Sequence, residues 1–306
     1  MESNKERLHE LLSRLEEKYA KTGQDLAAYL EGLLYADYVT YWDYIEVDTL
    51  LSLQKPRTNI PDEEIFIMYH QITELFFKLT LHEMKQIAAH AAPNVAFFTA
   101  RVQRINRYFE MLTHSFSVMI EGMEPEQFLK FRMALLPASG FQSAQYRMIE
   151  ICATDFIQLV AKDKRGQFSP DSSISELFEH IYWKSGATEI ASGKKTHTLI
   201  MFEEKYRETF IALGEQNRSN NLWQCYVKFG ENDETLKNAL QEFDQHVNVK
   251  WPLVHMQSAA RYLKQDPETI KATGGTNWQK YLSPPLQKRI FYPELWSKEE
   301  IEKWGR

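Results

Sequence analysis

Apolar residues recur at helical spacing through most of the chain, and no stretch of any length alternates regularly between apolar and polar residues. The first helical pattern lies near the N-terminus and has the i, i+3, i+4, i+7 spacing of an amphipathic helix, in Leu8, Leu11, Leu12 and Leu15. Charged residues separate these leucines. The pattern predicts a helix over residues 3–21, and its narrow apolar stripe is suited either to the chain's own core or to a partner subunit.

The same reasoning predicts a series of further helices. They cover residues 63–91, 95–121, 125–135, 142–162, 198–214, 234–248 and 253–264. Ser173 and Glu176 form a capping-box pattern before another apolar run. Residues 26–53 are rich in aromatic side chains, and no internal repeat or convincing linker interrupts the chain. We therefore expect an all-α, single-domain helical bundle spanning residues 1–306.

Composition agrees with long helices. The 306 residues include only 12 Gly and 11 Pro, but 18 Phe, 15 Tyr and 7 Trp. Few chain breakers and many rings indicate a helical core with much flat apolar surface.

Charge and cysteine content exclude several classes of protein. The formal net charge is −6, which argues against a nucleic-acid surface. No 18-residue apolar run is present and the N-terminus lacks the apolar block of a signal peptide, so we expect neither a membrane span nor secretion. Cys152 and Cys225 are too few for a disulfide framework or a four-thiolate metal site. A cytoplasmic location is the expectation.

Two of the nine histidines stand in almost wholly apolar surroundings. His70 follows Phe66-Ile67-Met68-Tyr69, and His255 lies between Val254 and Met256 in a Trp-Pro-Leu-Val-His-Met segment. A lone histidine on an apolar face is more often a satisfied core residue than a ligand, but two on separate helices favour a site. A single histidine is sufficient to hold a haem iron. We expect Pro252 in the first turn of the helix that bears His255, where its missing N–H costs nothing.

Arg132 is flanked by apolar residues on both sides. It is interpreted either as a side chain whose head reaches solvent at a helix edge, or as a buried guanidinium that needs an anionic partner. The break that follows contains Ser139 and Gly140, which could form a helix N-terminus with free amides. Di-iron, zinc and phosphate-loop spacings are absent, as is Gly-x-Ser-x-Gly.

At these residues the sequence resembles the tryptophan 2,3-dioxygenase family of haem enzymes. The resemblance runs from about residue 34 to 297, is strong in the first half, and is carried by ordered motifs. These are Tyr41-x-x-Tyr44; Phe66-Ile67-x-x-His70-Gln71; Phe131-Arg132 with Pro137-Ala138-Ser139-Gly140-Phe141-Gln142-Ser143; His255-Met256; Thr273-Gly274-Gly275; and Tyr292-Pro293-Glu294-Leu295.

The resemblance implies a role for each matching position. His255 would be the proximal ligand of haem b, with Ser139 and Gly140 near the haem edge. His70 would lie beside the indole N–H, within a substrate-binding run that also holds Phe66, Ile67, Met68 and Tyr69. Arg132 would pair with the substrate carboxylate, and Thr273 would contact the amino-acid end. Phe128 stands in the pocket where some members have tyrosine. Tyr41, Tyr44 and Ile45 match a segment that reaches into the neighbouring subunit's site.

The implied activity is cleavage of the indole C2–C3 bond of L-tryptophan by O₂, which gives N-formyl-L-kynurenine. The implied assembly is a homotetramer, a dimer of dimers, in which residues 1–24 form a helix used in oligomerisation. Three alternatives stay open: a related haem-dependent oxygenase with another indole or aromatic substrate, a haem sensor or carrier without turnover, and a structural helical protein.

Overall fold

The computed structural model describes residues 2–36, 40–90, 92, 94–135, 140–169, 171–188, 194–263 and 283–306. Contacts divide the chain into two compact units, Met1–Leu53 and Gln54–Arg306. Within the described ranges the regular structure is helical, apart from isolated β-bridges that pair Val160 with Ile181 and Thr188 with Lys195. The prediction of an all-α fold is confirmed. The single-domain organisation stays a prediction.

The N-terminal unit contains four helices: α1 (Glu2–Ala20), α2 (Leu26–Tyr35), α3 (Tyr41–Tyr44) and α4 (Val47–Leu51). The helix predicted over residues 3–21 corresponds to α1. Asp25 begins α2 because its carboxylate accepts a hydrogen bond from the backbone N–H of Ala27 at 2.9 Å. The leucine stripe of α1 is exposed, with Leu8, Leu11 and Leu15 all more than a third accessible. The use of this helix in oligomerisation stays a prediction.

The second unit is built on longer helices joined by short helical turns. Its α-helices are α5 (Asp62–Ala89), α6 (Val95–Ser115), α7 (Ser117–Ile120), α8 (Pro125–Phe131), α9 (Ala144–Ala153), α10 (Lys162–Arg165), α11 (Ile174–Glu179), α12 (His197–Asn217), α13 (Leu222–Phe229), α14 (Glu234–Gln245), α15 (Trp251–Leu263), α17 (Pro284–Gln287) and α18 (Lys298–Glu302). Its 3₁₀ turns are η1 (Arg132–Leu135), η2 (Gly140–Gln142), η3 (Phe156–Leu159), η4 (Tyr182–Ala187) and η6 (Pro293–Leu295), and η5 (His246–Lys250) is a π-helical turn. None of the helices in these described segments is long and apolar enough to cross a membrane.

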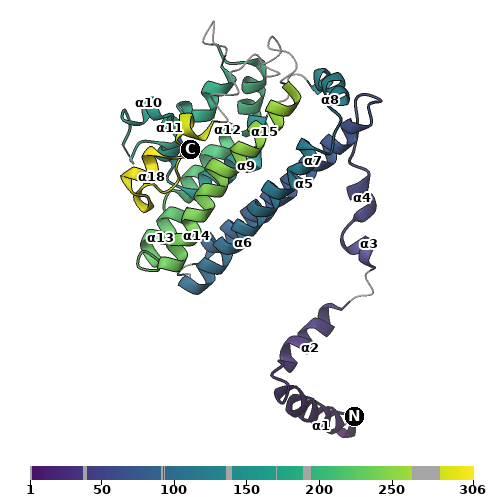
Figure 1. Cartoon of the computed structure of the whole chain (residues 1–306). Coiled ribbons are helices and arrows are strands. Elements are labelled where there is room, and N and C mark those ends of the chain that lie inside the picture. Colours follow the sequence, from purple (N-terminus) through teal and green to yellow (C-terminus); the bar gives the residue numbers. More distant parts are fainter. Residues whose placement is uncertain are drawn as a thin grey trace. The chain divides into compact units, whose positions relative to one another are not determined.

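The core lies where α6 packs between α5 and α14, while α9 packs against α5 and α12 (Figure 1). Apolar residues of α6 at helical spacing are fully buried, among them Phe98, Val102, Ile105 and Phe109. The Asn106 side chain on the same helix donates to the Ala239 carbonyl oxygen at 2.9 Å and fastens α6 to α14. The apolar stripe that predicted the second long helix is therefore the stripe that forms the core.

The differences from the sequence-based expectation include two helix ends and one additional helix. The helix predicted over residues 142–162 ends at Ala153, because the Thr154 hydroxyl leaves the helix to donate to the Phe291 carbonyl oxygen at 2.6 Å. The helix predicted over 95–121 ends at Ser115, and the short α7 continues after it. The helix α13 was not predicted, although Asn221 caps it by accepting from the Gln224 N–H at 2.9 Å. The capping box of Ser173 and Glu176 is present at the start of α11.

Pro252 is the second residue of α15 and lies in the first turn of the helix that carries His255, as expected. This helix does not, however, start freely at that point. The segments α14, η5 and α15 follow one another without a break, and Pro252 lies inside this continuous helical run. The π-helical turn directly before it changes the hydrogen-bond register, with the Trp251 N–H donating to the His246 carbonyl oxygen. A proline is tolerated here because the local register is already altered.

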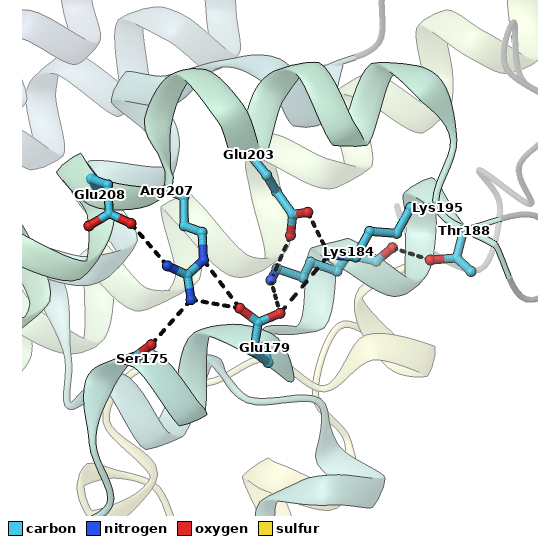
Figure 2. A network of polar contacts seen from close by, with 8 residues as sticks. All are labelled: Ser175, Glu179, Lys184, Thr188, Lys195, Glu203, Arg207 and Glu208. Atoms are coloured by element: carbon cyan, nitrogen blue, oxygen red, sulfur yellow. Dashed lines mark hydrogen bonds and ion pairs between the residues drawn. The ribbon is translucent and has the colours of Figure 1, made fainter.

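A charged network fastens η4 to α11 and α12 (Figure 2). The Lys184 ammonium is buried and lies 2.6 Å from a carboxylate oxygen of Glu203 and 3.2 Å from one of Glu179. Arg207 donates to the other oxygen of Glu179 at 3.0 Å, and Lys195 lies 2.6 Å from Glu203. The Lys184 charge is thus matched by carboxylates on two elements, which indicates a structural role.

Candidate functional site

His255 lies on α15 against two aromatic rings. Its ring centroid is 4.4 Å from that of Trp251 and 4.5 Å from that of Phe116. Its Nδ1 atom lies 2.9 Å from the Trp251 carbonyl oxygen. Burial lowers the pKa of His255 to about 4; the Trp251 carbonyl opposes this shift and His70 adds to it. The imidazole is therefore neutral, and because a carbonyl only accepts, Nδ1 carries the proton and Nε2 keeps its lone pair.

His70 on α5 has the same local arrangement. Its Nδ1 atom lies 2.7 Å from the Phe66 carbonyl oxygen one turn earlier, and its ring lies 4.1 Å from the Phe66 ring. Burial lowers the pKa of His70, although the Phe66 carbonyl and Glu74 act in the opposite direction. His70 is thus also neutral, with a lone pair available on Nε2.

The two histidines belong to one site. His70 is close enough to lower the pKa of His255 electrostatically, although one lies on α5 and the other on α15. Burial lowers both pKa values, yet the His70 ring is exposed and the His255 ring only half-buried. The two imidazoles are thus electrostatically coupled, and each keeps an Nε2 lone pair on a side chain that is not fully buried.

Aromatic side chains from three elements form a cluster that begins at Phe66, beside His70. Phe66 of α5 lies 6.3 Å from Phe128 and 5.7 Å from Phe131, both on α8. Phe128 in turn lies 4.5 Å from Tyr262 on α15. The Tyr262 hydroxyl donates to the Met119 carbonyl oxygen at 2.6 Å, so its polar end is used and its ring faces the cluster. Such a cluster offers aromatic surface on which a flat apolar ligand could pack.

Arg132 follows Phe131 directly and is 7% exposed. Burial alone lowers the pKa of its guanidinium, and within the described part of the chain no carboxylate or carbonyl accepts a hydrogen bond from it. Arg132 has no nitrogen among the described buried atoms that lack a partner, so its head keeps access to solvent. The structure combines both interpretations of the sequence: the side chain is largely covered, and its guanidinium is open to an anion that could bind in bidentate fashion.

The remaining predicted site residues fall into four groups. Ile67 is half-buried and Met68 is exposed, whereas Tyr69 points into the core, with its hydroxyl 3.4 Å from the Leu112 carbonyl oxygen. Gly140 begins η2. Tyr41, Tyr44 and Ile45 are exposed residues of the N-terminal unit. Ser139 and Thr273 lie outside the described residues.

Sequence reasoning did not assign Phe116, Trp251 and Tyr262 to the site. The last two carried a usable signal, because they lie four residues before and seven residues after His255, on the same helical face. Phe116 carried none, since it reaches His255 only through the packing of α6 against α15.

The donor set restricts the metal chemistry. Among the described residues, no three His, Cys, Asp or Glu side chains gather into a group that could hold a metal ion. A zinc or di-iron centre needs such a group, whereas a haem iron needs one axial histidine. A neutral His255 with a free Nε2 beside aromatic rings fits that requirement.

Comparison with known proteins agrees with this chemistry. A family model described as tryptophan 2,3-dioxygenase matches residues 32–178. The chain is 41% identical over 275 residues to a protein of that name from Bradyrhizobium sp. (strain BTAi1), covering 84% of this chain and 91% of the relative. It is 38% identical over 269 residues to the Ruegeria pomeroyi protein of the same name, covering 86% and 92%. The chain therefore belongs to the tryptophan 2,3-dioxygenase family.

Proposed function

We propose that this protein is a haem-dependent L-tryptophan 2,3-dioxygenase, which opens the indole C2–C3 bond with O₂ and gives N-formyl-L-kynurenine. The observation that carries the proposal is the combination of two neutral, electrostatically coupled histidines with the largely covered Arg132, whose guanidinium has no acceptor among the described residues. Family membership supports the same reaction class.

His255 is the residue that would hold haem b, through Nε2. The Trp251 carbonyl fixes the proton on Nδ1 and orients the ring, which is the usual outer-shell support of a metal-binding histidine. Ser139 and Gly140 are proposed to lie near the haem edge. When bound, haem supplies the redox-active iron for the reaction with O₂.

His70 is proposed to accept a hydrogen bond from the indole N–H. Its Nδ1 proton is engaged by the Phe66 carbonyl, so only the Nε2 lone pair is available, and an N–H group is the partner that a lone pair needs. In this role His70 positions the indole ring and is not required as a base.

The amino-acid end of the substrate is assigned to Arg132 and Thr273. Arg132 begins η1 directly after Phe131, whose ring lies 5.7 Å from that of Phe66, so its backbone is near the aromatic residues proposed to hold the indole. A carboxylate bound there would gain two charge-assisted hydrogen bonds. Thr273 is proposed to contact the ammonium and carboxylate.

Aromatic residues complete the proposed pocket. Phe66 and Phe128 would contact the indole faces and exclude water, so that catalysis depends mainly on positioning. Ile67, Met68 and Tyr69 belong to the proposed substrate-binding run. Tyr41, Tyr44 and Ile45 are proposed to act from the neighbouring subunit of a homotetramer, and their exposure leaves them available for this role.

One observation favours a second candidate, a haem-dependent oxygenase for another indole or aromatic substrate. Phe128 offers no hydroxyl, and the Tyr262 hydroxyl beside it is held by the Met119 carbonyl. A substrate without a polar group on its ring therefore meets no unsatisfied donor on this part of the cluster.

The deciding experiment supplies reduced, haem-loaded protein with O₂ and L-tryptophan, D-tryptophan or indole in parallel. We expect N-formyl-L-kynurenine from L-tryptophan, detected by mass spectrometry, at a higher rate than any product from the other two. Preferred turnover of indole, or of a substrate without a carboxylate, would support the second candidate. Haem binding without product from any of the three would point to a carrier or sensor.

A further inference from the structure

In the helical run that carries His255, residues at a spacing of four share one face, and this face packs on the core. Phe243, Val247, Trp251 and His255 follow one another at this spacing, and the first three are buried. In a straight α-helix each step of four drifts by about 40° around the axis. The wider π-helical turn η5 takes up this drift and sets the face on which His255 emerges.

The π-helical register and the proline that follows it leave the Val247 carbonyl without a helical donor. The Trp251 N–H donates to the His246 carbonyl oxygen, five residues earlier. In the same register, the partner of the Val247 carbonyl would be the N–H of residue 252, but residue 252 is proline and has none. A buried carbonyl in this position needs a donor from elsewhere.

Two side chains remote in sequence supply that donor. The Tyr146 hydroxyl of α9 donates to the Val247 carbonyl oxygen at 3.0 Å, and the Arg289 guanidinium lies 3.4 Å from the same oxygen. Arg289 also donates to the Tyr146 oxygen at 3.1 Å, so the three groups close a triangle. Tyr146 is 6% exposed and Val247 is fully buried, which excludes water as an easy substitute.

The triangle is itself anchored on both sides. Arg289 pairs with the buried Glu150 carboxylate at 2.8 Å and donates to the Asn248 side-chain oxygen. The Asn248 amide donates to Asp244 at 2.6 Å. Asp244 also accepts from the backbone N–H groups of Phe291 and Tyr292 at 3.0 and 3.2 Å. The C-terminal segment is thus joined to η5 by a continuous set of buried hydrogen bonds.

We propose that Tyr146 and Arg289 are positioning residues for His255: by holding the Val247 carbonyl they maintain the π-helical turn that aims the imidazole at the haem iron. A change of register by one residue would rotate His255 by about 100° around the helix axis, away from Phe116. The role in iron ligation rests on the proposed function. The hydrogen-bond brace on η5 does not.

The first test is Tyr146→Phe, with Tyr226→Phe as the matched control. The Tyr226 hydroxyl is also buried and also donates to a backbone carbonyl, that of Glu231 at 3.1 Å, but it lies on α13. We expect Tyr146→Phe to speed haemin release about fivefold, the scale of one buried hydrogen bond, and to shift the ferrous iron–histidine stretching band in resonance Raman spectra. Tyr226→Phe should change neither. Equal haemin release from the two variants would overturn the proposal.

The second test restores the missing donor within the helix. Pro252→Ala supplies an N–H at residue 252, which can bind the carbonyl that Tyr146 serves in the unmodified protein. In this background we expect Tyr146→Phe to change haemin release less than twofold. An undiminished effect would mean that Tyr146 acts by another route, and the proposal would fail.

Amide hydrogen exchange of the haem-free protein separates this proposal from the proposed function. We expect residues 247–256 to exchange faster in Tyr146→Phe than in Tyr226→Phe, and the difference to vanish when Pro252→Ala is added to Tyr146→Phe. If the unmodified protein binds no haem through His255, the proposed function fails, and the exchange pattern still decides whether the brace exists. Unchanged exchange in Tyr146→Phe would refute the brace.

Discussion

His255 and Trp251 form a unit in which one residue supplies both a carbonyl and a ring to the other. The Trp251 carbonyl oxygen lies 2.9 Å from His255 Nδ1, and the two ring centroids are 4.4 Å apart. The carbonyl fixes the tautomer and the indole restricts the ring plane. Orientation and protonation of the proposed iron ligand are thus both set within one helical turn.

The pKa of His255 leads to a prediction for the haem-free protein. Burial lowers this pKa from 6.5 to about 4, so the unfolded chain binds a proton between these pH values and the folded chain does not. Stability should therefore decrease as the pH falls from about 6.5 to 4. His255→Gln should reduce this dependence, measured by urea unfolding at a series of pH values. An NMR titration that gave His255 a pKa near 6.5 would contradict it.

Substitution of Arg132 should weaken substrate binding without affecting folding. Arg132→Ala should raise KM for L-tryptophan about 10- to 100-fold, because two charge-assisted hydrogen bonds to the substrate carboxylate are lost. Haem content and thermal stability should not fall, since in the free protein the guanidinium has no acceptor among the described residues. Arg132→Lys should recover KM only partly, because an ammonium cannot bind in bidentate fashion. A large loss of stability in Arg132→Ala would instead indicate a structural arginine.

The features of the fold that the sequence predicts correctly are those set by residues close to one another along the chain. The apolar stripe of α6 and the capping box that begins at Ser173 can both be recognised from neighbouring residues. The end of α9 cannot be predicted in this way, because the Thr154 hydroxyl donates to a carbonyl that is 137 residues away in sequence. The π-helical turn cannot be predicted from local sequence for the same reason, since the Tyr146 hydroxyl donates to its Val247 carbonyl across 101 residues.

The same distinction applies to the site. His70, His255 and Arg132 were found because a polar residue within an apolar run stands out in any sequence. Phe116 does not stand out, because it is an aromatic residue within the apolar stripe of its helix. Only the packing of helices brings it to His255.

The buried Lys184 should matter more for stability than an exposed lysine with the same kind of partner. Its ammonium lies 2.6 Å from Glu203 (Figure 2). It also lies 3.9 Å from the centre of the Phe178 ring. Lys184→Met should lower the free energy of unfolding by about 2 kcal/mol, less than for a fully isolated buried charge because Lys195 still pairs with Glu203.

The matched control for Lys184→Met is Lys303→Met, which removes the exposed pair with Glu299 and should cost about 0.5 kcal/mol or less. Urea unfolding measures both. Adding Glu203→Met to Lys184→Met should recover part of the loss, because no buried carboxylate is then left with reduced pairing. Equal effects of the two lysine substitutions would show that the network contributes no more than a surface pair.

His70 gives the sharpest test of how the indole is held. If its Nε2 lone pair only accepts the indole N–H, His70→Ala should lower kcat/KM for L-tryptophan about 5- to 10-fold, the scale of one hydrogen bond, and should not abolish turnover. An N-methylated tryptophan cannot make this bond. The unmodified protein should therefore discriminate against it, and His70→Ala should discriminate much less. The Nδ1 proton of His70 is already bound by the Phe66 carbonyl, so this side of the imidazole cannot replace the lost hydrogen bond to the indole. Complete loss of turnover in His70→Ala with haem retained would mean that the imidazole moves a proton, and the positioning role would be wrong.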